Sequence, residues 1–141
     1  MSELIKQGKK NSLIRQKALA LTQELPQKDT AGEVRALWNF VKNNIRYVRD
    51  ISNVETVQFP EQTMSQESGD CDDKSVLLAS LLESIGHPTR LIAVGFKPGM
   101  LSHVFIDTRW GKGWLPLETT VDKPMGWRPP NIVFALPPLY N

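Results

Sequence analysis

Residues 69–88, GDCDDKSVLLASLLESIGHP, place the only cysteine of the chain at the start of a predicted helix. Asp70 is a suitable N-cap residue, because its carboxylate can accept hydrogen bonds from the first-turn amides. The run at residues 75–85 is rich in Leu, Val and Ala, so the helix is expected to be buried on most sides. Gly86 suits the position after the helix, and Pro88 prevents its continuation. This stretch therefore predicts a central, buried helix that begins at a thiol.

Three β-prone runs follow this helix, at residues 89–96, 102–108 and 113–118. The connectors between them are short and contain glycine, which is typical of antiparallel hairpins. Helices followed by a meander of strands favour an α+β fold over a parallel α/β fold. We therefore expect an α+β fold with an antiparallel sheet in the second half of the chain.

Two more helices are predicted before the cysteine. Apolar residues recur at helical spacing over residues 13–25, and Pro26 ends that helix. The sequence Thr30-Ala31-Gly32-Glu33 is typical of a capping box, in which the Thr30 hydroxyl and the Glu33 carboxylate bind first-turn amides. The helix behind it carries the clearest apolar stripe of the chain: Val34, Leu37, Trp38, Val41 and Ile45.

The remaining segments are predicted to be less regular. Residues 1–11 are polar and are expected to be flexible. Residues 49–68 contain Pro60 and no sustained periodicity, so a long loop leading to the cysteine is expected. The Pro-rich residues 123–141 are expected to form an extended segment packed on the domain. At 141 residues the chain is predicted to be one domain, residues 1–141, with one sizeable core.

The composition argues against several classes of function. The 17 basic residues nearly balance the 15 acidic ones and are scattered, so neither nucleic-acid nor membrane binding is indicated. A single cysteine cannot form an internal disulfide. One cysteine and two histidines also provide fewer than the four ligands of a structural zinc site. The N-terminus lacks the apolar segment of a signal peptide, so a reducing cytoplasm is the expected location.

Three residues with the chemistry of a cysteine nucleophile occur in order along the chain: Cys71, His103 and Glu118. A thiolate attacks a carbonyl, an imidazole transfers the proton, and a carboxylate orients the imidazole. The first turn of a helix favours a thiolate, because it presents free amides and a partial positive charge. The three residues therefore predict acyl-transfer chemistry at Cys71.

Each of these residues also has a structural interpretation. A lone cysteine before a Leu-rich helix can be an inert buried residue, and the neighbouring aspartates disfavour another negative charge. A histidine on a strand can be a hydrogen-bonded core residue, and His87 is interpreted as a turn residue without chemistry. Asp107 and Asp122 are alternatives to Glu118, which is favoured because a carboxylate ending an apolar strand needs a partner.

The combined pattern resembles the transglutaminase-like superfamily, which is related to papain. The resemblance covers about residues 30–122 and rests on the helix motif above, on SHVFID at residues 102–107 and on GWLPLETT at residues 113–120. It also includes the Trp38 helix and the Ile-x-Tyr element ending at Tyr47. It implies a papain-like α+β fold with N-terminal helices, in which the nucleophile helix packs on an antiparallel sheet. The GDCDDK motif and the compact size are most similar to small bacteriophage or prophage proteins with this domain.

The resemblance implies the role of each member of the triad. Cys71 would be the nucleophile, His103 the base and acid, and Glu118 the residue that orients the imidazole. The family usually has aspartate at the last position, from which glutamate differs by one methylene.

The oxyanion hole has several candidates. Papain-like enzymes keep a glutamine near the position of Gln66, and the backbone amide of Asp72 lies in the first helical turn. Trp38 and Tyr47 are further candidates.

A related branch of bacterial cysteine proteases binds calcium beside the nucleophile. Asp70, Asp72 and Asp73 resemble the acidic residues of that branch, and oxygen ligands suit calcium. Adjacent acids are also ordinary at a helix start, so neither a metal nor a cofactor is expected.

The resemblance implies an enzyme that acts on an amide bond of a protein or peptide substrate through a thioester. Hydrolysis, as a peptidase or amidase, is the first expectation, and a cross-linking transglutaminase is the alternative. The other class is a non-catalytic phage assembly, virion or interaction protein that uses the fold as a scaffold. The short chain and the Pro-rich tail favour that class, which would place the protein with phage structural proteins rather than free in the host cytoplasm.

Overall fold

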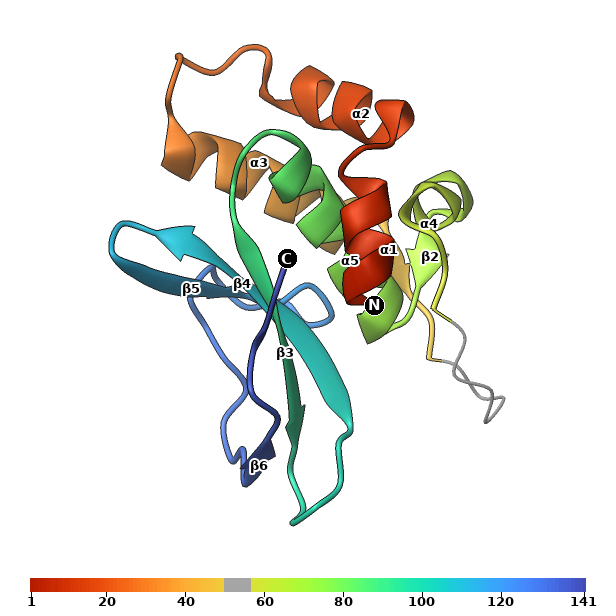
Figure 1. The fold of residues 1–141 in the computed structure, drawn as a ribbon, viewed down its shortest axis with the longest axis vertical. Helices are drawn as coiled ribbons and strands as arrows, with labels where there is room; N and C mark the ends of the chain where they lie inside the picture. The colour runs from red at the N-terminus through yellow and green to blue at the C-terminus, as the bar shows by residue number, and fades with distance from the viewer. Residues whose placement is uncertain (50–56) are drawn as a thin grey trace.

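The computed structural model describes residues 1–49 and 57–141. Its helices are α1 (Ser2–Gly8), α2 (Ser12–Thr22), α3 (Thr30–Asn44), α4 (Pro60–Gln66) and α5 (Cys71–Ser84). Its strands are β1 (Arg46–Tyr47), β2 (Ser68–Gly69), β3 (Thr89–Gly95), β4 (His103–Trp110), β5 (Gly113–Leu117), β6 (Phe134–Ala135) and β7 (Leu139–Tyr140). In Figure 1 the helices gather at one end of the sheet, and the β3–β4 hairpin extends away from them. No helix within the described ranges is long and apolar enough to cross a membrane.

The main sheet is antiparallel, which confirms the α+β prediction. Its strand order is β5-β4-β3-β6, and β7 also pairs with β3. The tail therefore extends the free edge of β3 with two short strands. Two register pairs matter for the site: Val94 lies opposite His103, and Ile106 lies opposite Leu117.

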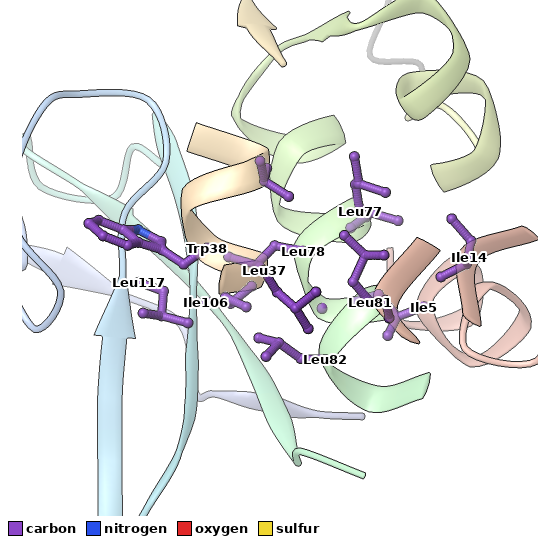
Figure 2. Packing of buried hydrophobic residues seen from close by; sticks show 14 of the residues in the cluster. Ile5, Ile14, Leu37, Trp38, Leu77, Leu78, Leu81, Leu82, Ile106 and Leu117 are labelled. Atoms are coloured by element: carbon purple, nitrogen blue, oxygen red, sulfur yellow. The ribbon is translucent and has the colours of Figure 1, made fainter. Parts of the chain in front are cut away.

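Helix α5 forms the centre of the core. Every residue from Asp73 to Leu82 is buried, because α1 to α4 and the sheet surround the helix. Figure 2 shows the leucines of α5 between α3 and the sheet on one side and α1 and α2 on the other. The labelled members of this cluster are Ile5, Ile14, Leu37, Trp38, Leu77, Leu78, Leu81, Leu82, Ile106 and Leu117. The nucleophile candidate therefore stands at the end of the most firmly packed element.

Residues 1–11, for which no regular structure was predicted, contain a helix. Ser2–Gly8 is helical, and Ile5 is fully buried against the core. Gly8 allows close contact with α5, since a Cβ at this position would overlap the Ser80 side chain. Two apolar residues, Leu4 and Ile5, and one glycine anchor a helix whose other residues are polar.

The loop expected at residues 49–68 is also partly wrong. Residues 50–56 lie outside the described residues, but Pro60–Gln66 forms α4. Pro60 is the first residue of this helix, a position where its fixed φ and missing N–H are favourable.

The predicted capping box at Thr30 begins one residue too late. The N-cap of α3 is Asp29, whose carboxylate accepts a 3.0 Å hydrogen bond from the Gly32 amide. The Glu33 carboxylate instead forms a hydrogen bond with the His87 ring, with 2.7 Å between Oε1 and Nε2. His87 is buried in the turn after α5, so it ties two helices together rather than standing free.

Substituting Gly95 with alanine is expected to destabilise the β3–β4 hairpin. A Cβ at this position would overlap the backbone carbonyl of Met100, which cannot move without shifting the hairpin. We expect a loss of ~1–3 kcal/mol in the free energy of unfolding, measured by urea denaturation. Gly113→Ala is the matched control, because its nearest contact is 4.0 Å away and its backbone needs no positive φ. Equal effects of the two substitutions would contradict the steric explanation.

Candidate active site

Cys71 is the first residue of α5 and is half-buried. A capping box fixes this helix start: Asp70 accepts from the Asp73 amide at 3.0 Å, and Asp73 accepts from the Asp70 amide at 3.1 Å. Asp73 also accepts a 2.8 Å hydrogen bond from the Gln58 amide. The acids beside the thiol therefore hold the backbone around it.

Strand β1 brings Tyr47 to the same place. It pairs in parallel with β2, which directly precedes the cysteine, and Tyr47 lies opposite Gly69. The Val48 amide donates to the Gly69 carbonyl at 2.9 Å. Burial raises the pKa of Tyr47, and the nearby charges of Cys71 and others add to this effect. The phenol is thus within electrostatic range of the thiol.

His103 and Glu118 form the tightest polar contact of the site. His103 Nε2 lies 2.6 Å from Glu118 Oε2. The pairing of Ile106 with Leu117 explains this contact, because continuing it by one residue sets Glu118 opposite Phe105. His103 and Glu118 are then diagonal neighbours on one face of the sheet, within reach of long side chains.

The Glu118 carboxylate is only 2% exposed and is fully provided with donors. Its Oε1 accepts from the amides of Thr119 and Thr120, at 3.1 and 3.2 Å, and from the Thr120 hydroxyl at 2.9 Å. The Trp38 indole donates to the Glu118 backbone carbonyl at 2.8 Å. Burial raises the pKa of Glu118, but the hydrogen bonds from His103 and Thr120 outweigh it and lower the value. The site holds this residue as a carboxylate.

His103 is held as an imidazolium. Burial lowers its pKa, but hydrogen bonds to Cys71 and Glu118 and their charges raise it to about 9. Because Glu118 occupies Nε2, the thiol side of the ring is Nδ1. The structure therefore brings together the predicted thiol, imidazole and carboxylate in the order that an activated cysteine requires.

The free energy of unfolding is expected to fall as the pH rises through about 9. The pKa of His103 rises from 6.5 to about 9 on folding, so its contribution is complete below pH 6.5 and lost above 9. The shift corresponds to a free energy on the order of 3 kcal/mol. Urea denaturation of wild type and His103→Gln between pH 6 and 10 tests this, since all other groups titrate in both proteins. Identical pH profiles would contradict a charged His103.

The two alternative carboxylates lie elsewhere. Asp107 shares the His103 face of β4 but forms a 2.8 Å ion pair with Arg90. Asp122 has a side chain that is 98% exposed and contacts Lys42 at 2.6 Å. Glu118 is the carboxylate that reaches the ring.

The structure separates the oxyanion candidates. Gln66 is exposed, and its side chain accepts from the Gln58 side chain at 3.0 Å rather than facing the thiol. The Trp38 indole is already bound to Glu118. Asp72 is the second residue of α5, with its carboxylate 3.8 Å from the Cys71 sulfur, and the role of its amide stays a prediction. Tyr47 is the candidate side chain that lies beside the helix start and within electrostatic range of the thiol.

Asp70, Asp72 and Asp73 are the acidic residues that resemble a calcium site. Across the described residues no cluster of three or more His, Cys, Asp or Glu side chains could hold a metal ion. Asp70 and Asp73 use oxygens to bind each other's amides, which gives these two acids a structural role at the helix start. Burial raises the pKa of Asp73 to about 6, while its two amide donors favour the charged form.

Sequence reasoning missed Lys74. Its side chain is almost fully buried, and its ammonium donates to the Ile45 carbonyl at 2.7 Å. The available signal was its position one turn after Cys71 within a Leu-rich helix, where a lysine is unusual.

Comparisons with known proteins agree with this geometry. The model of a family described as the transglutaminase-like superfamily matches residues 17–119. No curated protein matches the chain in sequence.

Two solved structures share the fold. One is a proposed cysteine protease from Cytophaga hutchinsonii, with a TM-score of 0.61 and 18% identity over 77% of this chain. The other is a proposed protease from Parabacteroides distasonis, with a TM-score of 0.65 and 15% identity over 82% of this chain. The matches span 37% and 25% of those two longer chains.

Proposed function

The chain belongs to the transglutaminase-like superfamily, and we propose that it is a cysteine-dependent hydrolase of amide bonds, a peptidase or amidase. The observation that carries this proposal is the 2.6 Å contact of His103 with Glu118, in a site where the thiol raises the pKa of the same imidazole. A buried, fully hydrogen-bonded carboxylate serves to orient and charge a histidine, which in turn favours a thiolate.

The proposed reaction has two steps. The Cys71 thiolate attacks the amide carbon, and His103 gives its proton to the nitrogen as the C–N bond breaks. The amine leaves, and the acyl group remains as a thioester on Cys71. His103, now neutral, takes a proton from water, whose hydroxide displaces the thiolate and releases the acid. Glu118 stays ionised throughout and keeps Nδ1 directed toward the sulfur.

The negative oxygen of each tetrahedral intermediate needs donors. Backbone amides in the first turn of α5 provide one source, because a helix N-terminus carries a partial positive charge. We assign the second donor to the Tyr47 hydroxyl, which β1 positions beside the helix start. Tyr47→Phe is expected to lower kcat by ~10²-fold with little change in KM. A change confined to KM would contradict this role.

Hydrolysis is favoured over cross-linking because one of the two similar structures is described as a proposed cysteine protease and the other as a proposed protease. The triad chemistry is the same for both reactions, since an amine can replace water in the second step. The acceptor must therefore be determined by experiment.

A pooled library of acetylated peptide amides, incubated with and without dansylcadaverine, tests the proposal. Mass spectrometry is expected to show free acids as the main products, and Cys71→Ala is expected to lose at least ~10³-fold in rate. Predominant transfer to dansylcadaverine would replace hydrolysis with cross-linking. No turnover together with an unreactive thiol would favour the scaffold function.

A further inference from the structure

A polar cavity of about 410 Å³ lies beside the candidate active site. The C-terminal end of α3, strand β1 and the segment after Glu118 form its walls. The lining residues used below are Lys42, Tyr47, Lys74, Thr119, Thr120 and Asp122. Three of them also belong to the surroundings of the triad, because Tyr47 is within electrostatic range of the thiol and the amides of the two threonines donate to Glu118. The cavity and the triad therefore share a wall.

Lys74 is the unusual residue of this cavity. It is 1% exposed, yet it lines the cavity and makes one hydrogen bond, to the Ile45 carbonyl, within the described part of the chain. An ammonium has three donors, so two of them lack a protein acceptor there. Burial lowers the pKa of Lys74 to about 8, while the charge of Glu118 raises it. A buried cation with unused donors favours an anion beside it.

Lys42 adds a second cation that a ligand could reach. Its ammonium contacts Asp122 at 2.6 Å, but the Asp122 side chain is 98% exposed. Water screens a pair with so exposed a carboxylate, so a substrate anion can displace Asp122 at low cost. Lys42 also lies over the Trp38 ring at 5.2 Å, which keeps the ammonium at the cavity.

We propose that this cavity is a substrate subsite that binds a carboxylate, with Lys74 at its floor and Lys42 at its mouth. The proposal deepens the proposed function, on which it rests: the hydrolase would prefer amides near an acidic side chain or near a free C-terminus. Thr119 and Thr120 also line the cavity, and the Thr120 hydroxyl connects this wall to Glu118 by its 2.9 Å hydrogen bond.

The position along α5 fits such a subsite. Lys74 follows Cys71 by three residues, which is close to one helical turn and a rise of ~4.5 Å. A group bound at Lys74 is thus expected to be within about one residue's length of the carbonyl that Cys71 attacks.

Three iodoacetyl dipeptides of matched size test the subsite through alkylation of Cys71. Iodoacetyl-Gly-Glu-amide carries a side-chain carboxylate, iodoacetyl-Gly-Gln carries a terminal carboxylate, and iodoacetyl-Gly-Gln-amide is neutral. Rates are measured by intact-protein mass spectrometry and divided by the rates with free cysteine. At least one anionic probe is expected to react about fivefold to tenfold faster than the neutral probe. The faster anionic probe identifies which source of carboxylate the cavity accepts.

Substitutions distinguish binding of the anionic probes in the cavity from the general attraction that the His103 charge exerts on any anion. Lys74→Met and Lys42→Gln are expected to reduce the anionic-to-neutral ratio severalfold, and Asp122→Asn to increase it. Lys112→Gln is the matched control, because it also removes one positive charge but lies far from the site. His103 begins β4, whereas Lys112 lies in the turn after the last residue of that strand. If Lys74→Met does not fold, Lys42→Gln and Asp122→Asn still decide the outcome.

A ratio near one in wild type, or an equal ratio in all variants, would overturn the subsite. The proposed function would survive that result as long as the neutral probe reacts quickly at Cys71 and slowly in His103→Ala. A slow neutral probe would instead refute the proposed function itself.

Discussion

Replacing Glu118 with glutamine is expected to lower the rate of Cys71 alkylation at pH 7 by tenfold or more. Glutamine can still accept from Thr119 and Thr120, but its amide cannot stabilise the imidazolium. Losing the carboxylate charge is expected to lower the pKa of His103 from about 9, since burial still lowers it and Cys71 alone is left to raise it. The ring would then carry less charge at neutral pH and would favour a thiolate less strongly.

Two measurements check the result with Glu118→Gln. NMR titration of the His103 ring reports its pKa, and iodoacetamide alkylation reports the thiol. Glu24→Gln is a matched control, because Glu24 is exposed in the segment between α2 and α3. An unchanged His103 titration in Glu118→Gln would show that the carboxylate does not charge the ring.

Replacing Leu81 with alanine is expected to cost about 3–5 kcal/mol in the free energy of unfolding. Leu81 is fully buried in α5, and Figure 2 shows it on the side of that helix that faces α1 and α2. The surrounding elements are rigid and cannot fill the cavity completely. For a chain of this size such a loss lowers Tm by roughly 10 °C or more.

Leu19→Ala is the control for this substitution. Leu19 is 48% exposed on α2, so the same chemical change should alter stability by no more than ~0.5 kcal/mol. Urea denaturation gives both free energies. Comparable losses in the two variants would contradict the assignment of α5 as the centre of the core.

Local signals predicted the elements around the thiol. The Asp70 cap and the apolar run after it define α5, and Gly86 with Pro88 defines its end, because these residues act on their own backbone. The three longer strands, β3, β4 and β5, were predicted within two residues, since alternation and turn chemistry are also local, whereas the two-residue strands were not predicted.

The parts that failed depend on contacts between distant residues. Helix α1 is stable because Ile5 and Gly8 meet α5, which no short-range pattern reveals. The pairing of His87 with Glu33 joins residues 54 positions apart. Proline at 60 was interpreted as a loop residue although it begins α4.

The candidate site divides in the same way. The order Cys71, His103, Glu118 was readable and Glu118 was already favoured over Asp107, while the register of β4 with β5 explains how Glu118 reaches the ring. Gln66 could be separated from Tyr47 only once the structure placed them, with Gln66 bound to Gln58 and Tyr47 beside the helix start.

The most direct test of an activated thiol at Cys71 is its alkylation by iodoacetamide as a function of pH, in wild type and in His103→Ala. Wild type is expected to react rapidly already at pH 6 to 7, where an ordinary thiol with a pKa near ~8.5 is mostly protonated. In His103→Ala the reaction should be at least tenfold slower at pH 7 and should accelerate only toward alkaline pH. Slow alkylation with the same pH dependence in both proteins would contradict a catalytic cysteine.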